Sequence, residues 1–229
     1  MNAAHDPPTA MFDIYQDFED GAVLTGQGFD IILTRRSMGR LQLPTGRLVA
    51  CDPFEFPDTE AFTVEFAPGD YPTRLIGAQL RDGLRPAYAV IELLKAPAAR
   101  WVEAELPGDA ARPWYADEES GHAITSSTAC FMDLSTATRY LDYLEILTPD
   151  DDDEIARLAH LQNQRNLKRA NGMAWANVGQ EILGGNLVLF EAEPDLYRTY
   201  IGYTEDDTPA RVVTDLGVLG LRFPSFSMF

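Results

Sequence analysis

The sequence FTVEF, at residues 62–66, gives the clearest indication of the fold. Side chains alternate between the two faces of an extended chain, so Phe62, Val64 and Phe66 share one face. Thr63 and Glu65 then fall on the opposite face. Alternation of apolar and polar residues is typical of a strand with one buried face. The stretch therefore predicts a half-buried β-strand.

Similar short apolar runs, separated by Gly, Pro and Asp, recur along the chain and predict further strands. These lie at residues 22–24, 30–34, 47–51, 74–79, 87–94, 101–105, 124–132, 186–192, 197–203, 211–214 and 218–223. The weak pattern WVEAE at residues 101–105 predicts an edge strand. The polar loop TEDDTPA predicts a hairpin between the strands at 197–203 and 211–214.

The periodicity changes after Asp133. In LSTATRYLDYLEIL, apolar residues recur every three or four positions, which predicts a helix with Ser135 as its N-cap. Acidic residues 150–154 follow Thr148 and Pro149, and basic residues lie at 165, 168 and 169. This order complements a helix dipole and predicts a second helix that ends near residue 171.

Together these patterns predict an α+β fold: a predominantly antiparallel β-sheet or sandwich with a helical segment after residue 134. We expect one domain over residues 1–229, with residues 1–10 as a loose N-terminal lead-in. Residues 135–171 are expected to form a helical insertion. No composition shift or internal repeat marks a second domain.

The charge balance limits the classes of partner. Eighteen basic and 36 acidic residues give a net charge of −18, which disfavours binding to nucleic acid and to anionic membranes. The same charge suits a basic protein partner, although it also serves solubility. The N-terminus has no basic segment followed by an apolar one, and no apolar stretch approaches 18 residues. We therefore expect a cytoplasmic protein.

Four segments in order carry a resemblance to a known family: LPTGRLVACDPF (43–54), STACFMDL (127–134), MAWANV (173–178) and ARVVTDLGVL (210–219). With GDYPTRL (69–75), they resemble the bacterial family named domain of unknown function 4241. The resemblance implies a β-rich, cytoplasmic domain and no defined reaction. It also implies a setting of bacterial conflict and toxin immunity. Two segments depart from the family pattern: SSTA (126–129) replaces a Gly-rich stretch, and EPD (193–195) replaces a Trp-Gly-Asp-Gly turn.

Three aspartates are the candidate catalytic or metal-binding residues. Asp52, Asp133 and Asp215 each follow an apolar run, so all three could lie at strand ends on one rim of the sheet. Converging carboxylates can hold Mg²⁺ or Ca²⁺, or can act in acid–base catalysis. The alternative is local: Asp52 begins a turn, and Asp133 caps or approaches the helix that begins near Ser135.

A second candidate is a nucleophile–base pair of Cys130 and His122. The apolar flanks of Cys130 instead favour an inert buried thiol. Two cysteines, Cys51 and Cys130, do not make a disulfide framework in a chain of this length. The acidic run at residues 150–154 lacks the spacing of a calcium loop, and no phosphate-loop spacing is present, so no cofactor is expected.

The sequence therefore predicts an immunity-type, non-enzymatic binding protein that engages a basic protein through its acidic surface. The alternative is a small hydrolase or metal-assisted enzyme centred on Asp52, Asp133 and Asp215.

Overall fold

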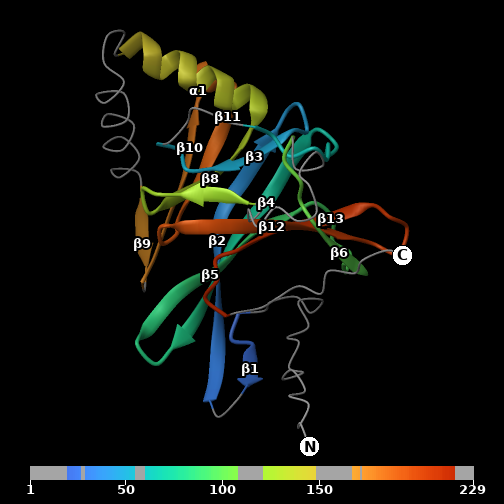
Figure 1. The fold of residues 1–229 in the computed structure, drawn as a ribbon, viewed down its shortest axis with the longest axis vertical. Helices are drawn as coiled ribbons and strands as arrows, with labels where there is room; N and C mark the ends of the chain where they lie inside the picture. Colours follow the sequence, from blue (N-terminus) through green and yellow to red (C-terminus); the bar gives the residue numbers. More distant parts are fainter. Residues whose placement is uncertain are drawn as a thin grey trace, which may run out of the picture.

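Two antiparallel sheets form the body of the protein (Figure 1). The computed structural model describes residues 20–26, 29–54, 60–107, 121–147, 167–170 and 172–219. The larger, eight-stranded sheet contains β1 (Val23–Gly26), β2 (Phe29–Leu43), β4 (Gly69–Leu80), β5 (Gly83–Glu92), β6 (Arg100–Glu103), β7 (His122–Ile124), β12 (Asp195–Tyr203) and β13 (Pro209–Asp215). Its order is β1-β2-β4-β5-β13-β12-β6, and β7 pairs with β12.

The smaller, five-stranded sheet has the order β3-β8-β11-β10-β9. Its strands are β3 (Leu48–Cys51), β8 (Thr128–Asp133), β9 (Lys168–Ala170), β10 (Met173–Gln180) and β11 (Gly185–Glu191). The helix α1 (Leu134–Leu147) follows β8 directly, and a 3₁₀ turn, η2 (Glu181–Leu183), joins β10 to β11. Figure 1 shows α1 at the end of the molecule opposite β1.

Both faces of β8, in the smaller sheet, are buried, which explains its continuous apolar run. Phe131 packs with Phe190 and with residues of the larger sheet, in a cluster that lies between the two sheets. Cys130 and Met132 point to the other face, where Ala137 of α1 covers them. A strand covered on both faces loses the alternation seen in half-buried strands.

A β-bulge in β2 exchanges the faces of that strand. The register with β4 shifts between Ser37 and Gly39, which leaves Met38 as the extra residue. Before the bulge, Leu33 belongs to a cluster on the outer face of the larger sheet; after it, Leu41 belongs to the cluster between the sheets. Both residues have odd numbers, so one inserted residue has inverted the pattern. The strand runs for 15 residues, whereas the sequence predicted only residues 30–34.

The predominantly antiparallel β-structure with a helix is confirmed, but several details of the prediction are wrong. Residues 62–66 place Phe62 and Phe66 inside and Thr63 and Glu65 outside, as expected, yet they form only an isolated bridge between Arg47 and Glu65. The stretch predicted as one strand at 124–132 is two strands, β7 and β8. Ser127 separates them with a φ of 62°.

The predicted helical insertion is also corrected. Its first helix is α1, but Lys168–Ala170 is strand β9 rather than the end of a second helix. Strand β10 was not predicted, and residues 217–219 are not a strand. The expected lead-in 1–10, the acidic run 150–154 and the region 148–166 lie outside the described residues. Within the described residues, no helix has the length and apolar character that crossing a bilayer requires.

Candidate functional site

Asp52, which follows β3, ties two loops together. It is 1% exposed. Its Oδ2 accepts hydrogen bonds from the backbone N–H groups of Thr125 and Ser126, at 2.8 and 2.7 Å. Its Oδ1 accepts from the Phe54 N–H at 2.9 Å and from the Ser126 hydroxyl at 2.6 Å. The carboxylate thus joins the turn after β3 to the loop between β7 and β8, which is a structural role.

Asp133, the last residue of β8, is fully buried and caps α1. Its Oδ1 accepts from the Ser135 N–H at 2.9 Å and from the Ser135 hydroxyl at 2.6 Å. Its Oδ2 accepts from the Thr45 N–H at 2.9 Å. The predicted N-cap, Ser135, is therefore wrong: the helix begins at Leu134, so Asp133 is the cap and Ser135 lies in the first turn.

The structure does not bring the three predicted aspartates together. Leu48 pairs with Asp133 and Cys51 pairs with Cys130, so Asp52 and Asp133 lie at opposite ends of the β3–β8 pair. Asp215 ends β13 in the other sheet. The described residues contain no group of three His, Cys, Asp or Glu side chains that could hold a metal ion. The expected convergence on one rim is not observed.

Asp215 nevertheless differs from the other two aspartates. Burial raises the pKa of its carboxyl to about 6, while a hydrogen bond from the Gly217 N–H acts in the opposite direction. Tyr88 lies opposite Asp215 on β5, and burial, with Asp215 as the second cause, raises the pKa of its hydroxyl. Below a pH of about 6, the Asp215 carboxyl and the Tyr88 hydroxyl are therefore both protonated and uncharged.

Cys130 and His122 do not form a hydrogen-bonded dyad. Both ring nitrogens of His122 lack a hydrogen-bond partner within the described chain, and the ring is buried. Burial lowers the pKa of His122 to about 4, so the ring is neutral at pH 7. The neighbour of Cys130 is Cys51, whose Sγ lies 3.8 Å from the Cys130 Sγ.

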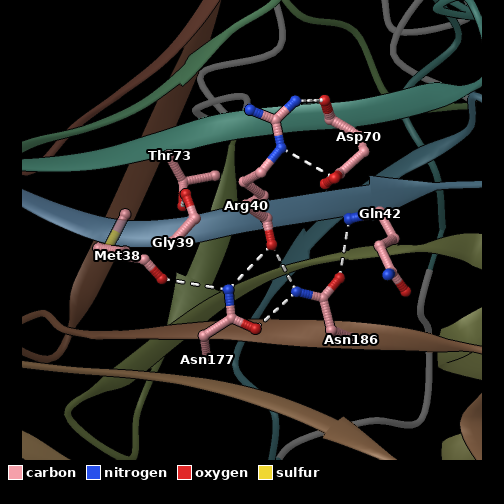
Figure 2. Close-up of polar contacts among 8 residues, drawn as sticks. All are labelled: Met38, Gly39, Arg40, Gln42, Asp70, Thr73, Asn177 and Asn186. Atoms are coloured by element: carbon pink, nitrogen blue, oxygen red, sulfur yellow. Dashed lines mark hydrogen bonds and ion pairs between the residues drawn. The ribbon is translucent and has the colours of Figure 1, made fainter. Parts of the chain in front are cut away.

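Two asparagines join the sheets at the bulge of β2 (Figure 2). The side-chain amide of Asn177 on β10 donates to Met38 O at 3.1 Å and to Arg40 O at 2.9 Å. Asn186 on β11 donates to Arg40 O at 2.7 Å and accepts from the Gln42 N–H at 2.8 Å. No strand of the described chain pairs with this edge of β2 here, and the two side-chain amides bond its backbone N–H and C=O groups instead. Sequence reasoning missed this joint, which is structural.

Gly39 makes the joint possible. Its φ is 97°, a region that favours glycine. A Cβ at this position would lie 2.7 Å from the Asn177 Nδ2, so a side chain would displace the amide. On the other side of β2, Arg40 forms an ion pair with Asp70 at 2.8 Å.

A hollow of about 200 Å³ opens among β5, the end of β11 and β12, and the residues just before β10 and just after β13 also line it. Its apolar lining includes Leu84, Pro86, Ala192, Leu216 and Val218. Its polar lining comprises Arg85, Glu191, Glu193 and Tyr197. The Tyr197 hydroxyl donates to Glu193 O at 2.6 Å, and burial, followed by nearby carboxylates, raises the pKa of that hydroxyl to about 12. We call this feature the acidic hollow.

The family model described as "Protein of unknown function (DUF4241)" matches residues 41–214. The chain belongs to this family. No curated protein and no solved structure matches it. The matched part contains the Asp52 and Asp133 networks, both cysteines and the two joint asparagines. Asp215 lies one residue beyond the DUF4241 match.

The two segments that the resemblance led us to expect as departures from the family pattern have distinct places in the structure. The first, SSTA at residues 126–129, includes Ser126, which binds Asp52. The second, EPD at residues 193–195, begins with Glu193 in the acidic hollow. No pattern in the sequence pointed to this hollow. Glu191 carried no signal, because it ends an ordinary strand.

Proposed function

We propose that the chain is a cytoplasmic, immunity-type binding protein that engages a basic protein partner through its acidic surface. In this proposal a lysine or arginine of the partner enters the acidic hollow. The surface charge of the described residues is the observation that carries it. Net charge of one sign attracts and orients a partner of the opposite sign before contact.

Five of the described arginines form ion pairs with the protein's own carboxylates. Ion pairs join Arg40 to Asp70, Arg74 to Glu92, Arg85 to Asp82, Arg100 to Asp207 and Arg198 to Glu103. Other exposed carboxylates have no ion pair within the described chain; they include Glu60, Glu65, Glu105, Asp142, Glu181 and Glu205. The charge left for a partner is therefore negative.

The acidic hollow suits a long cationic side chain. Its volume, about 200 Å³, is below that of a typical small-molecule site, which is about 300–1,000 Å³. Lysine and arginine bury an aliphatic stem against apolar surface and keep the charge near polar groups. The hollow offers both, with Leu84 and Leu216 for the stem and the carboxylates of Glu191 and Glu193 for the charge.

Arg85 supports this assignment, since a guanidinium already lies at the rim. Its Nη1 is 3.4 Å from the Glu193 Oε1, and its Nη2 is 2.6 Å from the Asp82 Oδ2. All three side chains are substantially exposed, so these ion pairs are weak and an incoming cation can compete for Glu193. The alternative enzyme, centred on Asp52, Asp133 and Asp215, has no shared site in its favour.

The test is capture of partners from the native host at low and high salt. The bait is the full chain, and captured proteins are identified by mass spectrometry. The double variant Glu191→Gln with Glu193→Gln is compared with Glu205→Gln with Asp206→Asn, which removes the same charge from the β12–β13 hairpin. We expect a basic partner whose recovery falls with salt and falls roughly tenfold, or about 1.4 kcal/mol, in the hollow variant alone. Captured proteins that are neither basic nor salt-sensitive would contradict the proposal.

A further inference from the structure

The two cysteines of the chain face each other across neighbouring strands. Cys51 ends β3, Cys130 lies in β8, and the two are register partners. Their Sγ atoms are 3.8 Å apart, and both side chains belong to the face covered by α1. They lie 79 positions apart in the sequence, so only the fold brings them together. Neither thiol has a part in the proposed binding function.

The backbone at this position has the spacing of a disulfide. The Leu134 N–H donates to Arg47 O at 2.9 Å, which makes these residues a hydrogen-bonded pair of the β3–β8 ladder. Such pairs alternate along an antiparallel ladder, so Cys51 and Cys130, four positions further, form another. The Cα atoms of such a pair are about 5.5 Å apart. Disulfides bridge Cα separations of about 4.4–6.8 Å, so rotation of the side chains suffices to form the bond.

The two thiols differ in access. Cys130 is fully buried, and burial raises the pKa of its thiol well above the ordinary value. Cys51 is partly exposed at the end of its strand. An oxidant from solution therefore meets Cys51 first, and Cys130 is placed to react second.

The geometry points to a dithiol–disulfide modification site at Cys51 and Cys130, which takes a small-molecule disulfide such as oxidised glutathione as its oxidant. The Cys51 thiolate attacks one sulfur of the oxidant, forms a mixed disulfide and releases one thiol. Cys130 then loses its proton, and its sulfur attacks the Cys51 Sγ. This forms the Cys51–Cys130 bond, breaks the mixed disulfide and releases a second thiol. The protein loses two electrons and two protons, and the oxidant gains both.

The new bond would lock the region of the Asp52 network. Asp52 follows Cys51 directly and holds the Thr125–Ser126 loop, and Asp133 lies three residues beyond Cys130. A bond between β3 and β8 would restrain the unfolded chain across a long loop. The oxidised protein should therefore unfold at a higher urea concentration than the reduced protein.

The test is equilibration of the folded, full-length chain in mixtures of reduced and oxidised glutathione. Thiols are then blocked by alkylation in denaturant, and the intact mass is measured. We expect oxidising mixtures to yield a species that has lost two hydrogens and carries no alkyl group, and reducing mixtures to restore two alkylated thiols. The wild-type protein alone decides the matter: two alkylated thiols in every mixture would overturn the proposal.

Single variants test the order of reaction. In Cys130→Ala the mixed disulfide with glutathione should accumulate at Cys51. Cys51→Ala should react much more slowly, because the remaining thiol, that of Cys130, is buried. Circular dichroism confirms that each variant is folded. Equal glutathionylation of the two folded variants would overturn the assignment of Cys51 as the entry thiol.

Discussion

The amide of Asn186 donates a hydrogen bond to the Asn177 Oδ1 over 2.6 Å, and both amides also donate to Arg40 O. This small network closes the edge of β2 that faces the five-stranded sheet, at the point where the bulge exposes backbone groups. Asn186 is 5% exposed, so its hydrogen bonds form away from water. Buried amides of this kind are costly to leave without partners.

Replacing Asn186 should therefore loosen the joint between the sheets. In Asn186→Ala the Gln42 N–H loses its acceptor and Arg40 O loses one of its donors, so we expect a loss of about 1–3 kcal/mol in the free energy of unfolding. Urea denaturation at equilibrium measures it. Gln42→Ala is the matched control, because it alters an exposed side chain on β2 and keeps the backbone N–H that donates to the Asn186 Oδ1. Equal stability of the two variants would contradict a structural role for Asn186.

The identity of the helix cap can be tested by a second pair of variants. Asp133→Ala removes a buried carboxylate that accepts from Thr45 and Ser135, so we expect a loss of about 2–4 kcal/mol. Ser135→Ala removes one donor to that carboxylate and should cost about 1 kcal/mol. Thermal or urea unfolding ranks the two variants. A larger loss for Ser135→Ala would show that the serine, rather than the aspartate, is the cap.

The sequence predicts strands well where one side chain in two is apolar and fails where a tertiary contact changes the pattern. Strands β12 and β13 and their hairpin follow the prediction closely. Strand β10 was missed because Asn177 interrupts its apolar pattern, and that residue is polar because its amide binds β2. Strand β2 was predicted too short because the residue inserted at the bulge inverts its alternation.

The candidate site shows a similar limit. The local alternative for Asp133, a helix cap, is supported by its hydrogen bonds, since it depends on neighbouring residues. The remaining partners of Asp52 and Asp133 were not predictable: Thr125 lies 73 positions from Asp52, and Thr45 lies 88 positions from Asp133. The acidic hollow draws on three strands, β5, β11 and β12, and on the segments before β10, after β11 and after β13. No local pattern encodes such a set.

His122 should make the protein less stable as the solution becomes acidic. Its folded-state pKa is about 4, below the usual value of about 6.5, because burial disfavours the charged ring. A lowered pKa contributes stability that is complete above about pH 6.5 and is lost as the pH falls through about 4, up to about 3 kcal/mol. His122→Leu removes this dependence and also removes two ring nitrogens that lack partners within the described chain.

We therefore expect the free energy of unfolding of His122→Leu to equal or exceed that of the wild type at pH 7. The difference in favour of the variant should increase as the pH falls towards 4. Urea unfolding across that range measures the difference. The exposed-site variant Asp206→Asn corrects for general charge effects. A difference that stays constant with pH would show that the ring is not held neutral in the folded state.

Asp215 should act in the opposite direction over nearly the same range. Its folded-state pKa is raised to about 6 by burial, so the carboxyl contributes stability that is complete below about pH 4 and is lost as the pH rises through about 6. Because the side chain is partly exposed, solvent screening reduces the loss to about 1–2 kcal/mol.

Asp215→Asn retains an oxygen for the Gly217 N–H and does not ionise. The variant should equal the wild-type protein near pH 4 and exceed it in stability above about pH 7, as measured by urea unfolding. Taking the difference between variant and wild type cancels the contribution of His122, which is present in both proteins. A variant less stable than the wild type at pH 7 would show instead that the ionised carboxylate of Asp215 has a favourable partner in the folded protein.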